Sequence, residues 1–188
     1  MNRLAIIGSG RMAWIIGRNA HEMGIETFCF SNVDTDYIHA SIDVFNNISI
    51  FEKDEIIKEC KKYGINGVIA TTELTIPIAA YVAEQLHLTG LPYQISETIT
   101  DKYRNRVACR DVIGLNQPYF SEFFNREQLL SESFSYPLIV KPTSKGGKRG
   151  ITVVNDLDEL LTAFDYAKGY SQDGPVIVEG YISGGQEY

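Results

Sequence analysis

The chain has 188 residues, of which 44% are hydrophobic and 11% aromatic, so it can bury one large core or two small ones and is unlike a disordered protein. Its formal net charge of −7 at pH 7 argues against nucleic acid or an anionic membrane surface as a partner. The three cysteines are odd in number and far apart, which indicates reduced thiols and a cytoplasmic protein. No apolar run approaches the roughly 20 residues that span a bilayer.

The first half of the chain is predicted to alternate strands and helices. We expect strands over residues 3–7, 25–30 and 66–71, a short strand at 43–45, and helices over 11–23, 52–63 and 75–87. Gly24 and Gly64 stand where two of these helices should stop. Short links between alternating strands and helices predict an α/β domain with a parallel sheet covered on both faces.

The second half has a different pattern. A helical stretch, in one or two pieces, is expected over 96–113 and is closed by Gly114. Strands are expected at 117–123, 137–141, 151–154 and 175–180, and helices at 125–130 and 156–168. The last of these helices opens with Asp156 and Glu159, a D-x-x-E variant of the capping box. We therefore predict two domains, residues 1–95 and 96–188.

A first glycine motif, Gly8-Ser-Gly10-Arg-Met-Ala13, follows the first strand and fits G-x-G-x-x-A. Such a turn lets a phosphate approach the backbone at a helix N-terminus, but it is equally typical of a tight β–α turn that binds nothing. An NAD site also needs an acidic residue at the end of the second strand. That strand ends at Phe30-Ser31, and Asp34 lies beyond it, so an NAD-dependent oxidoreductase is the weaker alternative.

A second glycine motif follows the strand that ends at Lys141-Pro142. It runs Thr143-Ser-Lys-Gly-Gly-Lys-Arg-Gly150. Backbone N–H groups, hydroxyls and cations in one loop suit a polyphosphate. The loop does not open a helix as a Walker loop does. Further on, Val176–Ile182 is predicted to be a strand running into a polar turn, where backbone groups could hold an adenine ring.

The order of these segments resembles the ATP-grasp superfamily, which includes biotin carboxylase, D-alanine–D-alanine ligase, carbamoyl-phosphate synthase large chains and the carboxylate–amine ligases of purine synthesis. The similar segments are Thr100-Asp-Lys102, the Lys141-Pro142 strand end with its glycine loop, and V-I-V-E-G-Y-I-S-G-G-Q-E-Y from Val176. The resemblance implies a Rossmann-like pre-ATP-grasp domain with a parallel sheet over residues 1–95. It implies the first α+β subdomain of an ATP-grasp fold over 96–188.

The resemblance also implies the roles of individual residues. Lys102 and Lys141 would contact the nucleotide phosphates, and Glu179 would accept a hydrogen bond from the adenine amine. Gly180 and Ile182, on either side of Tyr181, would offer backbone groups to the ring, and Glu187 would bind the ribose. The mobile flap over the phosphates would consist of Ser144, Lys145, Gly146, Gly147, Lys148, Arg149 and Gly150. Lys148 departs from the relatives, which often carry a small hydroxyl residue there.

The implied activity is a ligase that uses Mg-ATP to phosphorylate a carboxylate, whose acylphosphate is then attacked by an amine or another nucleophile. The substrates would be small carboxylates and amines. We expect the carboxylates that bind Mg²⁺ to lie outside this chain, after Tyr188, so that the chain holds the N-terminal part of the ATP-grasp domain only. The last strand would then leave an unpaired edge and an uncovered apolar face, which favours self-association, as in a homodimer, or a missing partner segment. A non-catalytic ATP-binding module is a second alternative.

Overall fold

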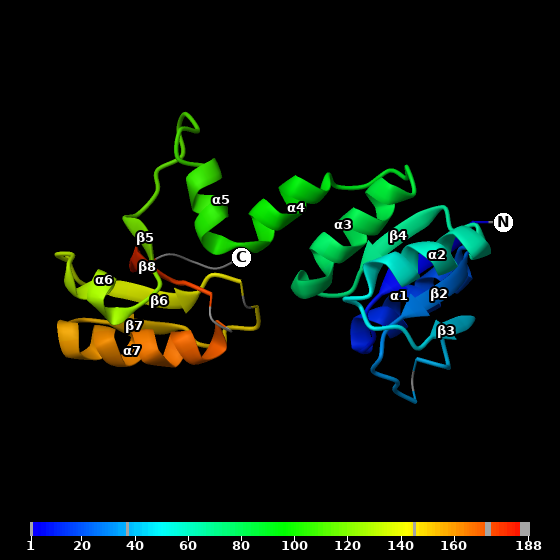
Figure 1. Cartoon of the computed structure of the whole chain (residues 1–188), viewed down its shortest axis with the longest axis horizontal. Helices are drawn as coiled ribbons and strands as arrows, with labels where there is room; N and C mark the ends of the chain where they lie inside the picture. Colours follow the sequence, from blue (N-terminus) through cyan, green and yellow to red (C-terminus); the bar gives the residue numbers. More distant parts are fainter. Residues whose placement is uncertain (1, 37, 145, 172–173, 185–188) are drawn as a thin grey trace. The chain divides into compact units, whose positions relative to one another are not determined.

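The computed structural model of the protein describes residues 2–36, 38–144, 146–171 and 174–184. The chain forms two compact units, Met1–Thr100 and Asp101–Tyr188, which run from blue to green and from green to red in Figure 1. The first contains a parallel sheet and the second an antiparallel sheet, so the predicted α/β class is confirmed. Each unit has a core of its own and is described by itself.

The first unit is built on a four-stranded parallel sheet in the order β3-β2-β1-β4. Its elements are β1 (Arg3–Ile7), α1 (Arg11–Glu22), β2 (Glu26–Phe30), β3 (Val44–Asn46), α2 (Lys53–Tyr63), β4 (Gly67–Ala70), the 3-10 turn η1 (Glu73–Thr75), α3 (Ile76–Gln85) and α4 (Tyr93–Thr100). The strands and helices predicted up to residue 87 are confirmed, with ends that differ by no more than two residues.

Helices cover both faces of this parallel sheet. Side chains alternate along a strand, so Ala5 and Ile7 point to the face that α2 and α3 cover, whereas Ile6 points to the face that α1 covers. The expected glycine stops are present, since Gly24 and Gly64 follow α1 and α2 with left-handed φ angles of 69° and 66°.

The second unit is an antiparallel sheet in the order β5-β8-β6-β7, with α7 packed against one face (Figure 1). Its elements are α5 (Lys102–Ala108), β5 (Phe120–Phe123), α6 (Arg126–Leu130), β6 (Leu138–Pro142), β7 (Thr152–Val154), α7 (Leu157–Tyr170) and β8 (Val176–Gly180). The expectation that the last strand is an unpaired edge was wrong, because β8 pairs with β5 on one side and β6 on the other. One of the two reasons given for a homodimer, the unpaired edge, disappears with it.

The helical stretch expected over 96–113 forms two helices in the structure, with bounds that differ from the prediction. α4 already begins at Tyr93 and ends at Thr100, and α5 begins anew at Lys102. The break falls on Asp101, whose extended backbone and side chain cap α5 by accepting from the Arg104 N–H at 2.8 Å. Because α5 ends at Ala108, Gly114 is not its stop.

Capping also explains the start of α7. The Asp156 carboxylate accepts from the Glu159 N–H at 2.8 Å, as the D-x-x-E pattern predicts. The Glu159 carboxylate accepts from the Asn155 N–H at 2.8 Å, one residue before the N-cap. This second bond is a variant of the capping box, in which the N3 side chain normally binds the amide of the N-cap itself.

Candidate functional site

The second unit contains a buried acidic residue, Glu179, in an otherwise apolar strand. Its side chain is 2% exposed, and both carboxylate oxygens meet a cation: Oε1 accepts from Arg106 Nε at 2.6 Å, and Oε2 pairs with Lys141 Nζ. Burial raises the pKa of Glu179, but hydrogen bonds and charge from Lys141 and Arg106 outweigh it and leave the pKa below its ordinary value. Glu179 is therefore an ionised group held by two cations.

The register of the sheet explains the contact between Glu179 and Lys141. Ile139 on β6 pairs with Glu179 on β8, so Lys141, two residues along β6, points to the same face as its diagonal neighbour. The opposite face of the sheet carries Val140 and Val178, which pack in the core with α7. The alternation of the strands thus separates an apolar face from a charged face.

Helix α5 brings Arg106 to the charged face. The Tyr103 ring meets Phe120 edge-on, with ring centroids 5.9 Å apart, and Phe120 is the β5 partner of Glu179. Gln117 Nε2 donates to the Arg106 carbonyl oxygen at 2.9 Å. These contacts hold the helix over β5 and β8 and aim Arg106 at Glu179.

Lys102, the first residue of α5, contacts the first residue of the glycine loop. Its backbone N–H donates to the Thr143 carbonyl oxygen at 2.8 Å, and its Nζ lies 3.5 Å from the same oxygen. Thr143 is buried, and it follows Lys141 by two residues. The structure therefore brings together Lys102, Lys141 and the loop, which sequence reasoning assigned separately to the phosphates.

The described part of the glycine loop is mostly exposed. Only Gly150 among its described glycines is buried. It has a φ of 71°, and a Cβ there would lie 2.9–3.1 Å from Pro142 and Tyr170, so a glycine is needed at this position. Lys148 has a positive φ of 58°, unusual for a residue with a side chain. Ser144, Gly146, Gly147, Lys148 and Arg149 are exposed, and Lys145 lies outside the described residues.

The end of β8 shows which backbone groups the sheet already uses. The Gly180 N–H donates to the Tyr119 carbonyl oxygen at 2.8 Å and the Tyr181 N–H to the Pro137 carbonyl oxygen at 3.0 Å. Neither bond uses the Gly180 carbonyl or the Ile182 N–H, the groups assigned to an adenine ring. The Ile182 side chain is exposed, and Glu187 lies outside the described residues.

The first glycine turn has a packing explanation. Gly8 has a φ of 97°, and a Cβ there would lie 2.5 Å from Thr71 Oγ1, so close approach of the turn to Thr71 requires glycine. Ser31 follows β2, and its hydroxyl lies 3.0 Å from that of Ser9. Asp34 lies farther along and pairs with His39. The NAD alternative is not favoured, since no acidic side chain ends β2.

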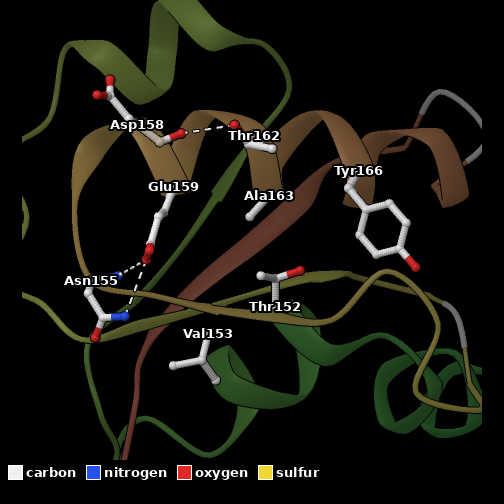
Figure 2. Close-up of a pocket in the computed structure, with 8 residues that line it drawn as sticks. All are labelled: Thr152, Val153, Asn155, Asp158, Glu159, Thr162, Ala163 and Tyr166. Carbon is white, nitrogen blue, oxygen red and sulfur yellow. Dashed lines mark hydrogen bonds between the residues drawn. The ribbon is translucent and has the colours of Figure 1, made fainter.

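A pocket of about 650 Å³ lies elsewhere in the second unit, along α7 and β7. Figure 2 shows Glu159 reaching back to Asn155, and the Thr162 hydroxyl donating to the Asp158 carbonyl oxygen. These groups stabilise the first turns of α7, and none of the residues assigned to ATP lines the pocket. We therefore do not assign the pocket to the nucleotide.

Two further kinds of site, a metal centre and a membrane-spanning helix, are absent from the part of the chain that the structure describes. Among residues 2–36, 38–144, 146–171 and 174–184, no group of three or more His, Cys, Asp or Glu side chains is placed to hold a metal ion. In the same ranges no helix has the length and apolar character needed to cross a bilayer. The described residues do not supply a carboxylate cluster for Mg²⁺.

Solved structures share this architecture. The L-amino acid ligase from Bacillus licheniformis superposes with a TM-score of 0.82 at 26% identity, covering 98% of this chain and 45% of that one. The N5-carboxyaminoimidazole synthetase from Staphylococcus aureus, solved with ADP, gives 0.77 at 16% identity, covering 96% of this chain and 48% of that one. The fold is therefore that of ATP-grasp ligases, which confirms the resemblance in the sequence.

In the sequence, residues 110–187 match the family described as the D-ala D-ala ligase C-terminus. A D-alanine–D-alanine ligase of Helicobacter pylori is 33% identical over 111 residues, which cover 58% of this chain and 29% of that protein. The chain spans less than half the length of the relatives that it matches.

Arg106 is the residue of this site that sequence reasoning missed. An arginine on a short helix is ordinarily a solvated side chain, and its partner Glu179 is 73 residues away. One signal was available: an acid within the apolar strand Val-Ile-Val-Glu-Gly must find cations or lose its charge once buried.

Proposed function

We propose that the protein is an ATP-dependent carboxylate–amine ligase and that its second unit grips the nucleotide. The observation that carries this proposal is the contact of Lys102 with Thr143, which follows Lys141 by two residues and starts an exposed basic loop. Cations and backbone N–H groups in such a loop suit a triphosphate. The S. aureus neighbour, solved with ADP, supports a nucleotide at this fold.

Within this proposal each residue keeps the role implied by the resemblance. Lys102 and Lys141 contact phosphates, Glu179 and the backbone of Gly180–Ile182 face the adenine, and Glu187 binds the ribose. Residues 144–150, including Lys145, close over the phosphates. The first unit is a Rossmann-like pre-ATP-grasp domain, which its strand order β3-β2-β1-β4 supports, and the domains divide at residues 95 and 96.

The reaction would take place in two steps. A substrate carboxylate oxygen attacks the γ-phosphorus of ATP, the bond to the β-phosphate oxygen breaks, and ADP and an acylphosphate form. An amine then attacks the carbonyl carbon, inorganic phosphate leaves, and the nitrogen loses a proton. Catalysis of such a transfer is mainly positioning and charge neutralisation, which Lys102, Lys141 and the loop could provide. Mg²⁺ would accompany ATP and neutralise part of the phosphate charge.

Amino acids are the first substrates to test. The B. licheniformis neighbour is an L-amino acid ligase and the H. pylori relative a D-alanine–D-alanine ligase. Both D- and L-amino acids should therefore be tested as the carboxylate and as the amine substrate. The free thiols Cys29, Cys60 and Cys109 support the cytoplasm as the compartment. A homodimer stays a prediction.

The test is an assay of the full-length protein with Mg-ATP and pairs of D- and L-amino acids, following ADP and phosphate release and the amide product. Amide formation that depends on ATP is the expected result. ATP binding without product from any carboxylate would favour a non-catalytic module, and binding of NAD in place of ATP would overturn the proposal.

A further inference from the structure

The proposed nucleotide and Glu179 compete for one ammonium group. Lys141 Nζ is paired with Glu179 Oε2, and the proposed function assigns the same group to the phosphates of ATP. A lysine carries three donors but a single charge, so its turn toward a triphosphate weakens its pairing with Glu179. Glu179 is 2% exposed, and water therefore cannot replace the lost cation.

A buried carboxylate without a cation is strongly destabilised in its ionised form. Without compensation, Glu179 would hold Lys141 back or would take up a proton when the lysine leaves. Either outcome opposes nucleotide binding. The site therefore needs a second cation that stays on Glu179.

Arg106 meets this requirement. Its Nε lies 2.6 Å from Glu179 Oε1, the oxygen that Lys141 does not use. A guanidinium keeps its charge at any physiological pH. Its helix is fixed to the sheet by the contact of Tyr103 with Phe120 and by the bond from Gln117 to the Arg106 carbonyl, so Arg106 does not depend on Lys141 for its place.

We propose that Arg106 is a positioning residue of the ATP site, which keeps the Glu179 carboxylate neutralised while Lys141 turns to the phosphates. The inference rests on the proposed function, because it needs Lys141 to bind ATP. It assigns to Arg106 no contact with the nucleotide: its effect passes through Glu179 alone.

The test is a double-mutant cycle on the full-length protein, with the Kd for ATP and the thermal unfolding midpoint measured at neutral pH. The variants are R106Q, E179Q and R106Q/E179Q, with R106K as a conservative change. R104Q is the matched control, since Arg104 is an exposed arginine on the same helix. Its replacement by glutamine removes the same charge from the unit.

We expect R106Q to raise the Kd for ATP about tenfold or more, equivalent to about 1.4 kcal/mol, and R104Q to change it less than about twofold. Once the carboxylate is gone, Arg106 has nothing to neutralise, so R106Q/E179Q should bind ATP within about threefold of E179Q. R106K should recover part of the loss. If R106Q does not fold, the double variant and R106K still supply the comparison with E179Q and with the wild type.

Other results overturn the inference. Arg106 would contact the nucleotide directly if its replacement weakened binding equally in the wild-type and E179Q backgrounds. An unchanged Kd in R106Q, with a wild-type protein that binds ATP, would refute the positioning role and leave the proposed function standing. A wild-type protein that does not bind ATP at all would refute both.

Discussion

The backbone N–H of Lys102 donates to the carbonyl oxygen of Thr143 at 2.8 Å. This bond joins the first residue of α5 to the first residue of the glycine loop, 41 positions apart in the sequence. Lys141 lies two residues before Thr143, near the end of β6. Two lysines assigned to the phosphates are thus attached to one short piece of backbone, and a nucleotide that binds them should also order the loop.

Replacement of Lys141 by alanine should weaken ATP binding or turnover about tenfold or more, or about 1.4 kcal/mol. The reason is the loss of a cation from the proposed phosphate site, together with the loss of one partner of Glu179. Isothermal titration with ATP and steady-state kinetics on the full-length protein measure the effect.

The control for this substitution is Lys58→Ala. Lys58 lies on an exposed face of α2 in the first unit, where it pairs with Glu55, and an exposed pair of this kind contributes little to stability. Its loss changes the net charge equally and should leave ATP affinity within about twofold. Equal effects of the two substitutions would mean that general charge, and not a phosphate contact, explains the loss.

The ion pairs of Glu179 with Lys141 and Arg106 should make the stability of the second unit depend on pH. The pKa of Glu179 is lowered in the folded protein from its ordinary 4.5, so the unfolded chain binds the proton more readily. Its stabilising contribution is therefore present above that ordinary pKa and is lost as the pH falls through the folded value. Hydrogen exchange of the β8 amides in acid, compared between wild type and E179Q, measures this contribution.

In the wild-type protein the protection of β8 should fall as the solution is made more acidic, whereas the E179Q curve should be flatter over the same range. Fluorescence is a poor substitute here, because the single tryptophan, Trp14, lies on α1 in the first unit. Parallel curves for the two proteins would show that other carboxylates cause the acid sensitivity.

The sequence predicted the elements better than the contacts between them. Strands and helix ends are indicated by local signals, namely alternating apolar residues and glycines such as Gly24 and Gly64. The structure confirms these strands and helix ends, and both glycines have left-handed φ angles. The sequence allowed two helical pieces within 96–113 but did not place the break at Asp101, because only the cap to Arg104 shows the new start.

The charged cluster could be predicted only in part. Lys141 and Glu179 stand at strand positions that the sequence marks, but their contact depends on the register of β6 against β8. The position of β8 within the sheet was also not visible, since strand order is set by long-range pairing. Arg106 reaches Glu179 by the packing of α5 on β5, which no local pattern specifies.

Two helical glycines should respond in opposite ways to replacement by alanine. A Cβ on Gly17 in α1 would lie 2.2 Å from the Ser41 carbonyl oxygen, whereas one on Gly169 in α7 would meet nothing within 4 Å. We expect Gly17→Ala to destabilise the protein by about 2 kcal/mol through overpacking. Gly169→Ala should stabilise it by about 0.5–1 kcal/mol, because alanine favours the helix.

Chemical denaturation followed by circular dichroism measures both changes, and each variant serves as the control for the other. A Gly17→Ala protein as stable as the wild type would mean that the segment around Ser41 moves away from α1 at little cost. The contact in the first unit would then not be the reason for glycine in that helix.

The last prediction concerns the glycine loop, in which residues 144 and 146–149 are exposed and carry the like charges of Lys148 and Arg149. Exposed loops are preferred sites of proteolytic cleavage, so trypsin should cut early after these two residues in the absence of nucleotide. Phosphates that bind the loop cations would reduce access. With ATP at about ten times its Kd, roughly a tenth of the protein stays unbound, and cleavage should slow about tenfold.

Peptide mass mapping over time follows the cuts, and cleavage after Arg110 supplies an internal reference, since Arg110 is exposed in the same unit but lies outside the loop. NAD at the same concentration should not protect the loop, and Lys141→Ala should need more ATP for the same protection. Protection by NAD as strong as that by ATP would point to general stabilisation of the fold. Rapid cleavage after Lys148 and Arg149 in saturating ATP would mean that the loop does not close over the phosphates, and the assignment of residues 144–150 as a flap would have to be abandoned.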